Sequence, residues 1–168
     1  MSVVVVLGMH RTGTSMTAGV LSRLGVDMGN VTKVEHWSNP YGQYEDGDFL
    51  RFNATVIAPG KWHKPPTREQ VMKNIKGKNL EDFKKMVAKR SRNNKLWGWK
   101  DPRTALTIEW LHPHLENPKY IWCVRNPSSV AESLERRNEM DQKKAMKLMA
   151  TYSNRIATFI KSNEEPFL

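Results

Sequence analysis

The sequence predicts a three-layer α/β fold, in which helices cover both faces of a central parallel sheet. Short apolar runs near residues 2–8, 96–100 and 120–124 have the length and composition of strands that are buried on both faces. The segments between these runs carry apolar residues at helical spacing, and strands that alternate with helices form parallel sheets. A further strand is expected to open near residues 166–168.

The first strand leads into a glycine-containing loop and then into a helix. Residues 3–8 form the apolar run and its terminating glycine, and the loop HRTGTS follows at residues 10–15. Met16, Val20 and Leu24 then fall on one helical face, which we expect to face the core. The first backbone N–H groups of a helix lack intrahelical partners and the helix dipole favours negative charge there, so this stretch predicts an anion-binding site.

Residues 8–15 match the phosphate-loop pattern G-x-x-x-x-G-K-[ST] at every defined position except one. Thr14 stands where the pattern has a lysine. Because that lysine normally reaches the β- and γ-phosphates, ATP or GTP chemistry is poorly supported. Arg11 keeps a cation inside the loop. The sequence therefore predicts a P-loop-type fold whose loop holds a smaller anionic group.

The loop resembles the 5′-phosphosulfate-binding loop of sulfotransferases that use 3′-phosphoadenosine 5′-phosphosulfate (PAPS). In those enzymes a lysine or arginine, a small residue, a glycine and two Ser/Thr residues follow one another, as in residues 11–15. The resemblance implies that this loop binds the donor. The residues implied in binding are Arg11, Thr12, Gly13, Thr14, Ser15 and Met16.

A second motif follows the strand near residues 120–124. Arg125 stands at the strand end and Ser133 follows eight residues later, in the setting R-N-P-x-x-V-A-x-S-L. This pair resembles the 3′-phosphate-binding pair of PAPS enzymes, in which arginine binds phosphate through its planar fork and serine adds a donor. Together the motifs imply PAPS as co-substrate, 3′-phosphoadenosine 5′-phosphate (PAP) as product, and no metal.

Charged residues follow the strand near residues 96–100, at the sheet edge where ligands bind in open parallel sheets. Lys100-Asp101-Pro102 resembles the Lys-Asp-Pro segment of tyrosylprotein sulfotransferases, in which the lysine is catalytic. A fixed cation stabilises the charge that builds on the bridging oxygen as the sulfuryl group leaves. Lys100 and Arg11 are therefore the expected catalytic cations, and a simple ion pair between Lys100 and Asp101 is the structural alternative.

Three residues are candidates for the general base. The segment NPYGQYED at residues 39–46 resembles bacterial sulfotransferases, and in the related tyrosylprotein sulfotransferases a glutamate of this region is the base. The resemblance favours Glu45, with Asp46 second, although Asp46 also suits a helix cap. Cytosolic sulfotransferases use a histidine base, which keeps His63 as a rival.

Further helices are expected from capping residues and from apolar residues at helical spacing. Their markers are Phe49, Phe52 and Val56; the capping box Thr67–Gln70; Leu80, Phe83 and Val87; residues 105–115; Val130 and Leu134; and, after a cap at Asp141, Ala145, Leu148, Met149, Tyr152, Ile156 and Phe159. Stacking on adenine is the alternative role for Tyr152.

The chain has 168 residues and a net charge of +10. Residues 61–100 carry thirteen Lys and Arg against three Asp and Glu, which accounts for the whole excess. We predict one sulfotransferase-like domain over residues 1–168 with a basic helical insertion at about 61–95. This basic segment is either a solvated face or a patch that steers the anionic donor or an acidic acceptor. Nucleic acid ranks lower because the segment lacks stacking aromatics.

The resemblance implies sulfuryl transfer from PAPS to a hydroxyl or amine of a small-molecule or polysaccharide acceptor. A P-loop nucleotide or small-molecule kinase is the enzymatic alternative and would need Mg²⁺ and a triphosphate. A non-catalytic polyanion-binding module is the other. A single cysteine, no apolar run of about 18 residues and no signal-peptide pattern predict a cytoplasmic protein without a membrane span.

Overall fold

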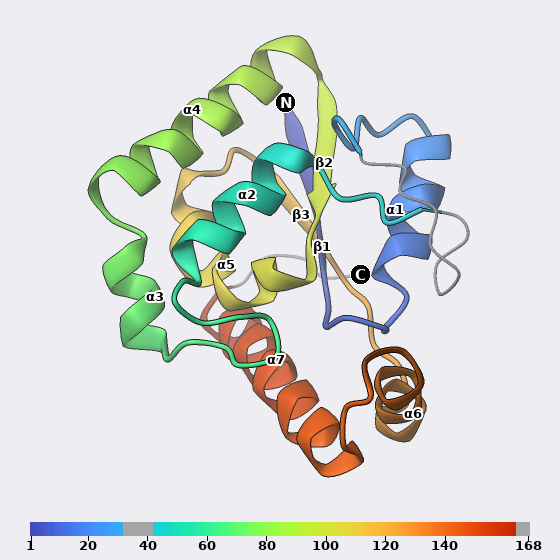
Figure 1. Cartoon of the computed structure of the whole chain (residues 1–168). Helices are drawn as coiled ribbons and strands as arrows, with labels where there is room; N and C mark the ends of the chain where they lie inside the picture. Colours follow the sequence, from blue (N-terminus) through green and yellow to red (C-terminus); the bar gives the residue numbers. More distant parts are fainter. Residues whose placement is uncertain (32–41, 164–168) are drawn as a thin grey trace.

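A computed structural model describes residues 1–31 and 42–163 of the chain (Figure 1). In these residues one sheet contains the strands β1 (Ser2–Leu7), β2 (Leu96–Lys100) and β3 (Pro118–Trp122). The helices are α1 (Thr14–Arg23), α2 (Gly47–Val56), α3 (Arg68–Asn74), α4 (Gly77–Asn93), α5 (Ile108–Leu111), α6 (Pro127–Asn138) and α7 (Gln142–Ser162), with the 3₁₀ helices η1 (Pro102–Leu106) and η2 (His112–His114).

The sheet is parallel throughout, with the strand order β2-β1-β3. Val5 at the centre of β1 is in register with Trp99 of β2 and Tyr120 of β3. Because the strands are parallel, their carboxyl ends lie at one edge of the sheet, where ligands bind in this class of fold. The parallel sheet predicted from the apolar runs is confirmed, and the strand expected at residues 166–168 lies outside the described residues.

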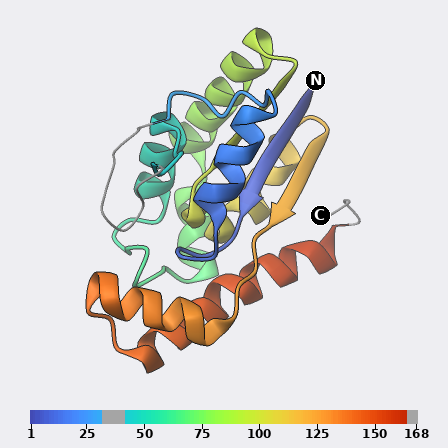
Figure 2. The ribbon, with the colours of Figure 1, turned by 90° about the vertical axis from the view of Figure 1, so that its right-hand side faces the viewer.

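The side chains of β1 enter two separate cores, since successive residues of a strand point to opposite faces. Val3, Val5 and Leu7 belong to the larger core, which is completed by residues of α2, α4, α6 and α7. Val4 and Val6 belong to the smaller core, which is completed by α1 and the segment after it. Helix α1 therefore covers one face and the α2–α4 side covers the other (Figures 1 and 2). This is the three-layer arrangement that the sequence predicts.

Local signals correctly locate several helices. Thr67 and Gln70 form the expected capping box of α3, and Asp141 caps α7 by accepting from the backbone of Lys144. Residues 105–115, expected to be helical until Pro113 disturbs the helix, are divided between η1, α5 and η2. Pro113 lies inside η2, where its missing N–H prevents a continuous α-helix.

Helix α7 buries the whole apolar face that the sequence predicts. Ala145, Leu148, Met149, Tyr152, Ile156 and Phe159 are all buried in it. It packs against α6 and η1 beneath the strand ends (Figure 1). Across both described ranges, every helix is too short or too polar to cross a lipid bilayer.

The predicted inward face of α1 is wrong. Met16, Val20 and Leu24 are 73%, 51% and 74% exposed. The buried side of α1 carries Thr14, Ala18 and Gly19, and a Cβ added at Gly19 would lie 3.2 Å from the Tyr44 ring. Close packing favours small residues on the buried side of α1, so the three larger side chains lie on its exposed side.

Candidate active site

A cavity of about 330 Å³ opens at the carboxyl ends of the strands. The loop after β1, the end of β2 and the residue Arg125 after β3 all contribute to its walls. The segment before α2, the loop with Trp62 and helix α6 complete it. Its position is the one that ligands occupy in open parallel sheets, and its volume is within the range of small-molecule pockets.

The loop between β1 and α1 leaves the first turn of α1 open to this cavity. Gly8 has φ 148°, and a Cβ there would lie 2.8 Å from Thr12 Oγ1 and 2.9 Å from the Cys123 carbonyl oxygen. Gly13, with φ 96°, precedes α1, and no side chain caps the helix in the described structure. The first N–H groups of α1 can therefore bind an anion, as the motif predicts.

Most residues of the predicted donor loop line the cavity. Arg11, Gly13, Thr14, Ser15 and Met16 do so. The side chain of Thr12 is buried in the loop, and its hydroxyl donates to the Met9 carbonyl oxygen at 2.8 Å. Thr12 therefore stabilises the loop and does not face the cavity.

Arg11 joins the two predicted donor motifs. Its Nε donates to Ser133 Oγ at 2.8 Å, and Arg125 Nη1 donates to the Arg11 carbonyl oxygen at 3.2 Å. Burial and the charges of Arg137, Arg125 and Arg136 lower the pKa of Arg11. Among the described residues, no carboxylate forms an ion pair with Arg125, Arg136 or Arg137. Clustered guanidinium groups suit an anion, so we name Arg11, Arg125 and Arg137, which all line the cavity, the arginine end.

Lys100 and Glu45 form the other end of the cavity. Lys100 is 1% exposed, and its Nζ donates to Glu45 Oε1 at 2.9 Å and to Ser15 Oγ at 3.2 Å. Burial lowers the pKa of Lys100, and the Glu45 carboxylate opposes that shift. Ser15 Oγ in turn donates to the Gln43 carbonyl oxygen at 3.1 Å, which ties the loop to the segment before α2. We name Lys100 and Glu45 the lysine end.

Asp101 does not take part in the lysine end. Its carboxylate pairs with Arg103, whose Nη2 lies 2.8 Å from Oδ2, and it also accepts from Asn53 Nδ2 at 3.0 Å. The simple Lys100–Asp101 ion pair is therefore absent from the described structure. Arg103 is thus the ion-pair partner of Asp101, and Glu45 is the ion-pair partner of Lys100.

Of the three candidate bases, Glu45 is the one that lines the cavity. Asp46 caps α2, where its Oδ1 accepts from the backbone N–H of Asp48 at 2.8 Å and of Phe49 at 3.3 Å. His63 is exposed and does not line the cavity. The capping role expected for Asp46 is confirmed, and the role of Glu45 as base stays a prediction.

Sequence reasoning missed His10, Trp62 and Arg137, all of which line the cavity. Arg137 lies one helical turn after Ser133, a spacing that places both on one side of α6 and could have indicated it. His10 is part of the donor-loop motif itself. Only the fold brings Trp62 to the site: the Tyr152 hydroxyl donates to its carbonyl oxygen at 3.0 Å. Tyr152 is fully buried and so cannot stack on adenine.

Comparison with known proteins gives one family match. The sequence model of the "Sulfotransferase family" matches residues 3–166. None of the curated proteins compared with the chain matches it. Among solved structures, deoxyadenosine kinase from M. mycoides with bound dATP is similar, with 13% identity, a TM-score of 0.39, and coverage of 100% of this chain and 89% of that chain.

Proposed function

Because the chain belongs to the sulfotransferase family, we propose that it transfers a sulfuryl group from PAPS to a hydroxyl or amine acceptor. The choice of PAPS as donor is based on one observation. Arg11 contacts both Ser133 and Arg125, so the two anion motifs meet at one end of one cavity. A bisphosphorylated nucleotide can therefore be bound by both motifs at once.

In this proposal the arginine end binds the phosphates of the donor. Arg125 and Arg137, which line the cavity, hold the 3′-phosphate. Ser133 is buried behind the lining, where its Oγ accepts from Arg11 and its hydroxyl hydrogen is left to donate to the phosphate. Arg11 and the N–H groups of residues 13–16 hold the 5′-phosphosulfate. Arg11 lies between the two sites because its side chain contacts Ser133 while its backbone belongs to the loop.

The lysine end carries out the transfer in this proposal. Glu45 accepts the proton of the acceptor hydroxyl or amine while the acceptor atom forms its bond to sulfur. The bond between sulfur and the bridging oxygen breaks, and its electron pair leaves with PAP. Lys100 and Arg11 stabilise the negative charge on that oxygen, the role that Mg²⁺ shares in kinases. Lys100 is suited to this because Glu45 already supports its charged form.

Thermal unfolding in the presence of PAP, without added metal, tests the donor assignment. We expect PAP at about 100 times its Kd to stabilise the protein by about 2.7 kcal/mol. Arg125→Ala should abolish this stabilisation, because the phosphate loses its bidentate partner. Arg92→Ala is the matched control, since it removes the same charge from an exposed position on α4.

Two other ligands separate the alternatives. Stabilisation by ATP with Mg²⁺ and not by PAP would point to a kinase. A response to heparin alone, lost as salt is added, would point to a polyanion-binding module. Either result would contradict the proposed function.

A further inference from the structure

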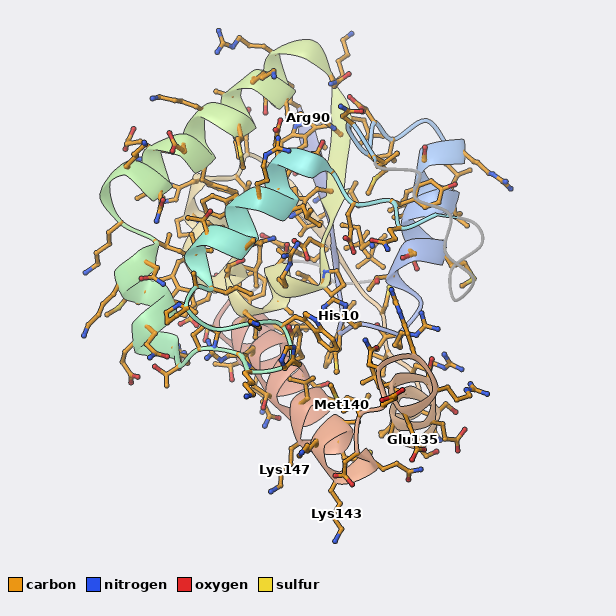
Figure 3. All side chains as sticks on the ribbon, viewed as in Figure 1. His10, Arg90, Glu135, Met140, Lys143 and Lys147 are labelled. Atoms are coloured by element: carbon orange, nitrogen blue, oxygen red, sulfur yellow. The ribbon has the colours of Figure 1, made fainter. Side chains whose placement is uncertain are left out.

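His10 is a cavity-lining residue to which the proposed reaction gives no role. It lies in the loop directly after β1, next to Arg11, at the strand ends (Figure 3). Its ring packs on Trp62 with centroids 4.6 Å apart, and the Tyr152 ring lies edge-on at 6.3 Å. Because Tyr152 also holds the Trp62 backbone, the imidazole is fixed from two sides.

The imidazole of His10 is neutral at pH 7. Burial lowers the pKa of His10 to about 3; the charge of Asp101 opposes the shift and the charges of Lys100, Arg103 and Arg137 add to it. Lys100, of the lysine end, lines the same cavity as His10. His10 therefore offers the cavity a hydrogen-bonding group without adding charge.

The two ring nitrogens of His10 differ in their surroundings. Nε2 is buried and has no hydrogen-bond partner within the described ranges, whereas Nδ1 is not enclosed in this way. A neutral imidazole has one donor nitrogen and one acceptor nitrogen. A buried N–H without a partner is rarer than a buried acceptor without one. The proton therefore belongs on Nδ1, where it can reach a group in the cavity.

We propose that His10 binds the sulfuryl group of the donor through a hydrogen bond from Nδ1–H. This rests on the proposed function. His10 belongs to the anion loop and lines the same cavity as Lys100, so its donor can contact a sulfuryl oxygen while Lys100 Nζ contacts the bridging oxygen. A fixed neutral donor orients the sulfuryl group for attack from the side of Glu45. Trp62 and Tyr152 act as positioning residues for the ring.

Affinities for PAPS and PAP, measured by calorimetry without acceptor, isolate this contact because PAP lacks the sulfuryl group. His10→Phe keeps the packing on Trp62 and removes both nitrogens. His10→Asn places an amide N–H near the Nδ1 position, and His10→Gln places one near Nε2. We expect His10→Phe and His10→Gln to lose about tenfold in PAPS affinity and nothing in PAP affinity. His10→Asn should retain PAPS affinity.

Each contrary result has a distinct meaning. If the unmodified protein binds neither nucleotide, the proposed function fails. If it binds both and His10→Phe keeps its full affinity for PAPS, the role of His10 is overturned while the donor assignment stands. Equal losses of PAP and PAPS affinity in His10→Phe would show that His10 only shapes the loop. Rescue by glutamine and not by asparagine would also overturn the proposal, since Nδ1 would not be the donor.

Discussion

The ammonium group of Lys100 is buried, where a charge destabilises the protein unless it is paired. A buried ammonium group needs a partner, because the penalty of removing it from water is several kcal/mol. Glu45 and Ser15 are its hydrogen-bond partners, and Glu45 remains accessible enough to line the cavity. Each charge therefore keeps the other in place before any ligand arrives. The same two residues are the proposed base and the proposed leaving-group cation, so positioning and chemistry depend on one ion pair.

Glu45→Gln separates these two roles. The amide oxygen can still accept from Lys100, but it cannot take a proton, so we expect kcat to fall by roughly a hundredfold or more with PAP affinity unchanged. The rate is measured as PAP release from PAPS with an alcohol acceptor, whose hydroxyl is not ionised at pH 7. Asp48→Asn, three residues further along, is the control and should leave kcat unchanged. An unaltered kcat in Glu45→Gln would exclude this residue as the base.

At the scale of elements, the start of α2 determines where Glu45 lies. Asp46 Oδ1 caps the helix, and its Oδ2 accepts from the Asn30 backbone at 3.0 Å and lies 3.7 Å from Arg90 Nη1 of α4. Gly29 makes this packing possible, because a Cβ there would lie against Asp46 Oδ2. Arg90 is at the opposite end of the strands from His10 (Figure 3). The first turn of α2 is thus fixed by α4 from outside the cavity.

Asp46→Ala should destabilise the protein by about 2 kcal/mol, through the lost cap and the loss of the carboxylate that pairs with the half-buried Arg90. Asp46→Asn keeps the cap and should cost less. The free energy of unfolding in urea at pH 7 measures both. Asp141→Ala is the matched control: it removes the exposed cap of α7 and should cost about 1 kcal/mol. Equal losses in the two alanine variants would mean that the contacts of Asp46 beyond its cap contribute nothing.

At the scale of the whole molecule, the excess charge lies on one side of the sheet. The basic segment at residues 61–95 forms α3 and α4, which lie on the side opposite α1 (Figure 1). A groove of about 510 Å³ runs between α2 and α4, and its charged lining is Arg51, Lys78, Lys85 and Lys89 with Asp48 and Asp82. The groove has an excess of positive charge and therefore attracts anions.

Replacing Lys78, Lys85 and Lys89 by Gln together should weaken heparin binding and reduce its dependence on log salt by about 2 to 3 units. PAP affinity should stay unchanged, because the groove is separate from the donor cavity. The control replaces Lys143, Lys144 and Lys147 by Gln; all three are exposed near the start of α7, and Figure 3 labels Lys143 and Lys147. Heparin affinity at 50 and 200 mM salt measures both. The same effect in both triple variants would assign heparin binding to net charge alone.

Much of the fold can be predicted because its signals are local. An apolar run, a capping box or the Asp141 cap depends on residues close together in the chain, and each of these was identified correctly. The face of α1 could not be predicted from periodicity. Gly19 meets Tyr44, and that contact between distant segments, rather than the spacing of Met16, Val20 and Leu24, decides which side is buried.

The sequence by itself determined the order of the elements, the parallel sheet and the family, because these follow from neighbouring residues and from two short motifs. Only the tertiary structure decided which functional groups meet. Arg11 and Ser133 are 122 residues apart, and Lys100 and Glu45 are 55 apart. Packing of the whole chain sets those distances, as it sets the burial that keeps His10 neutral.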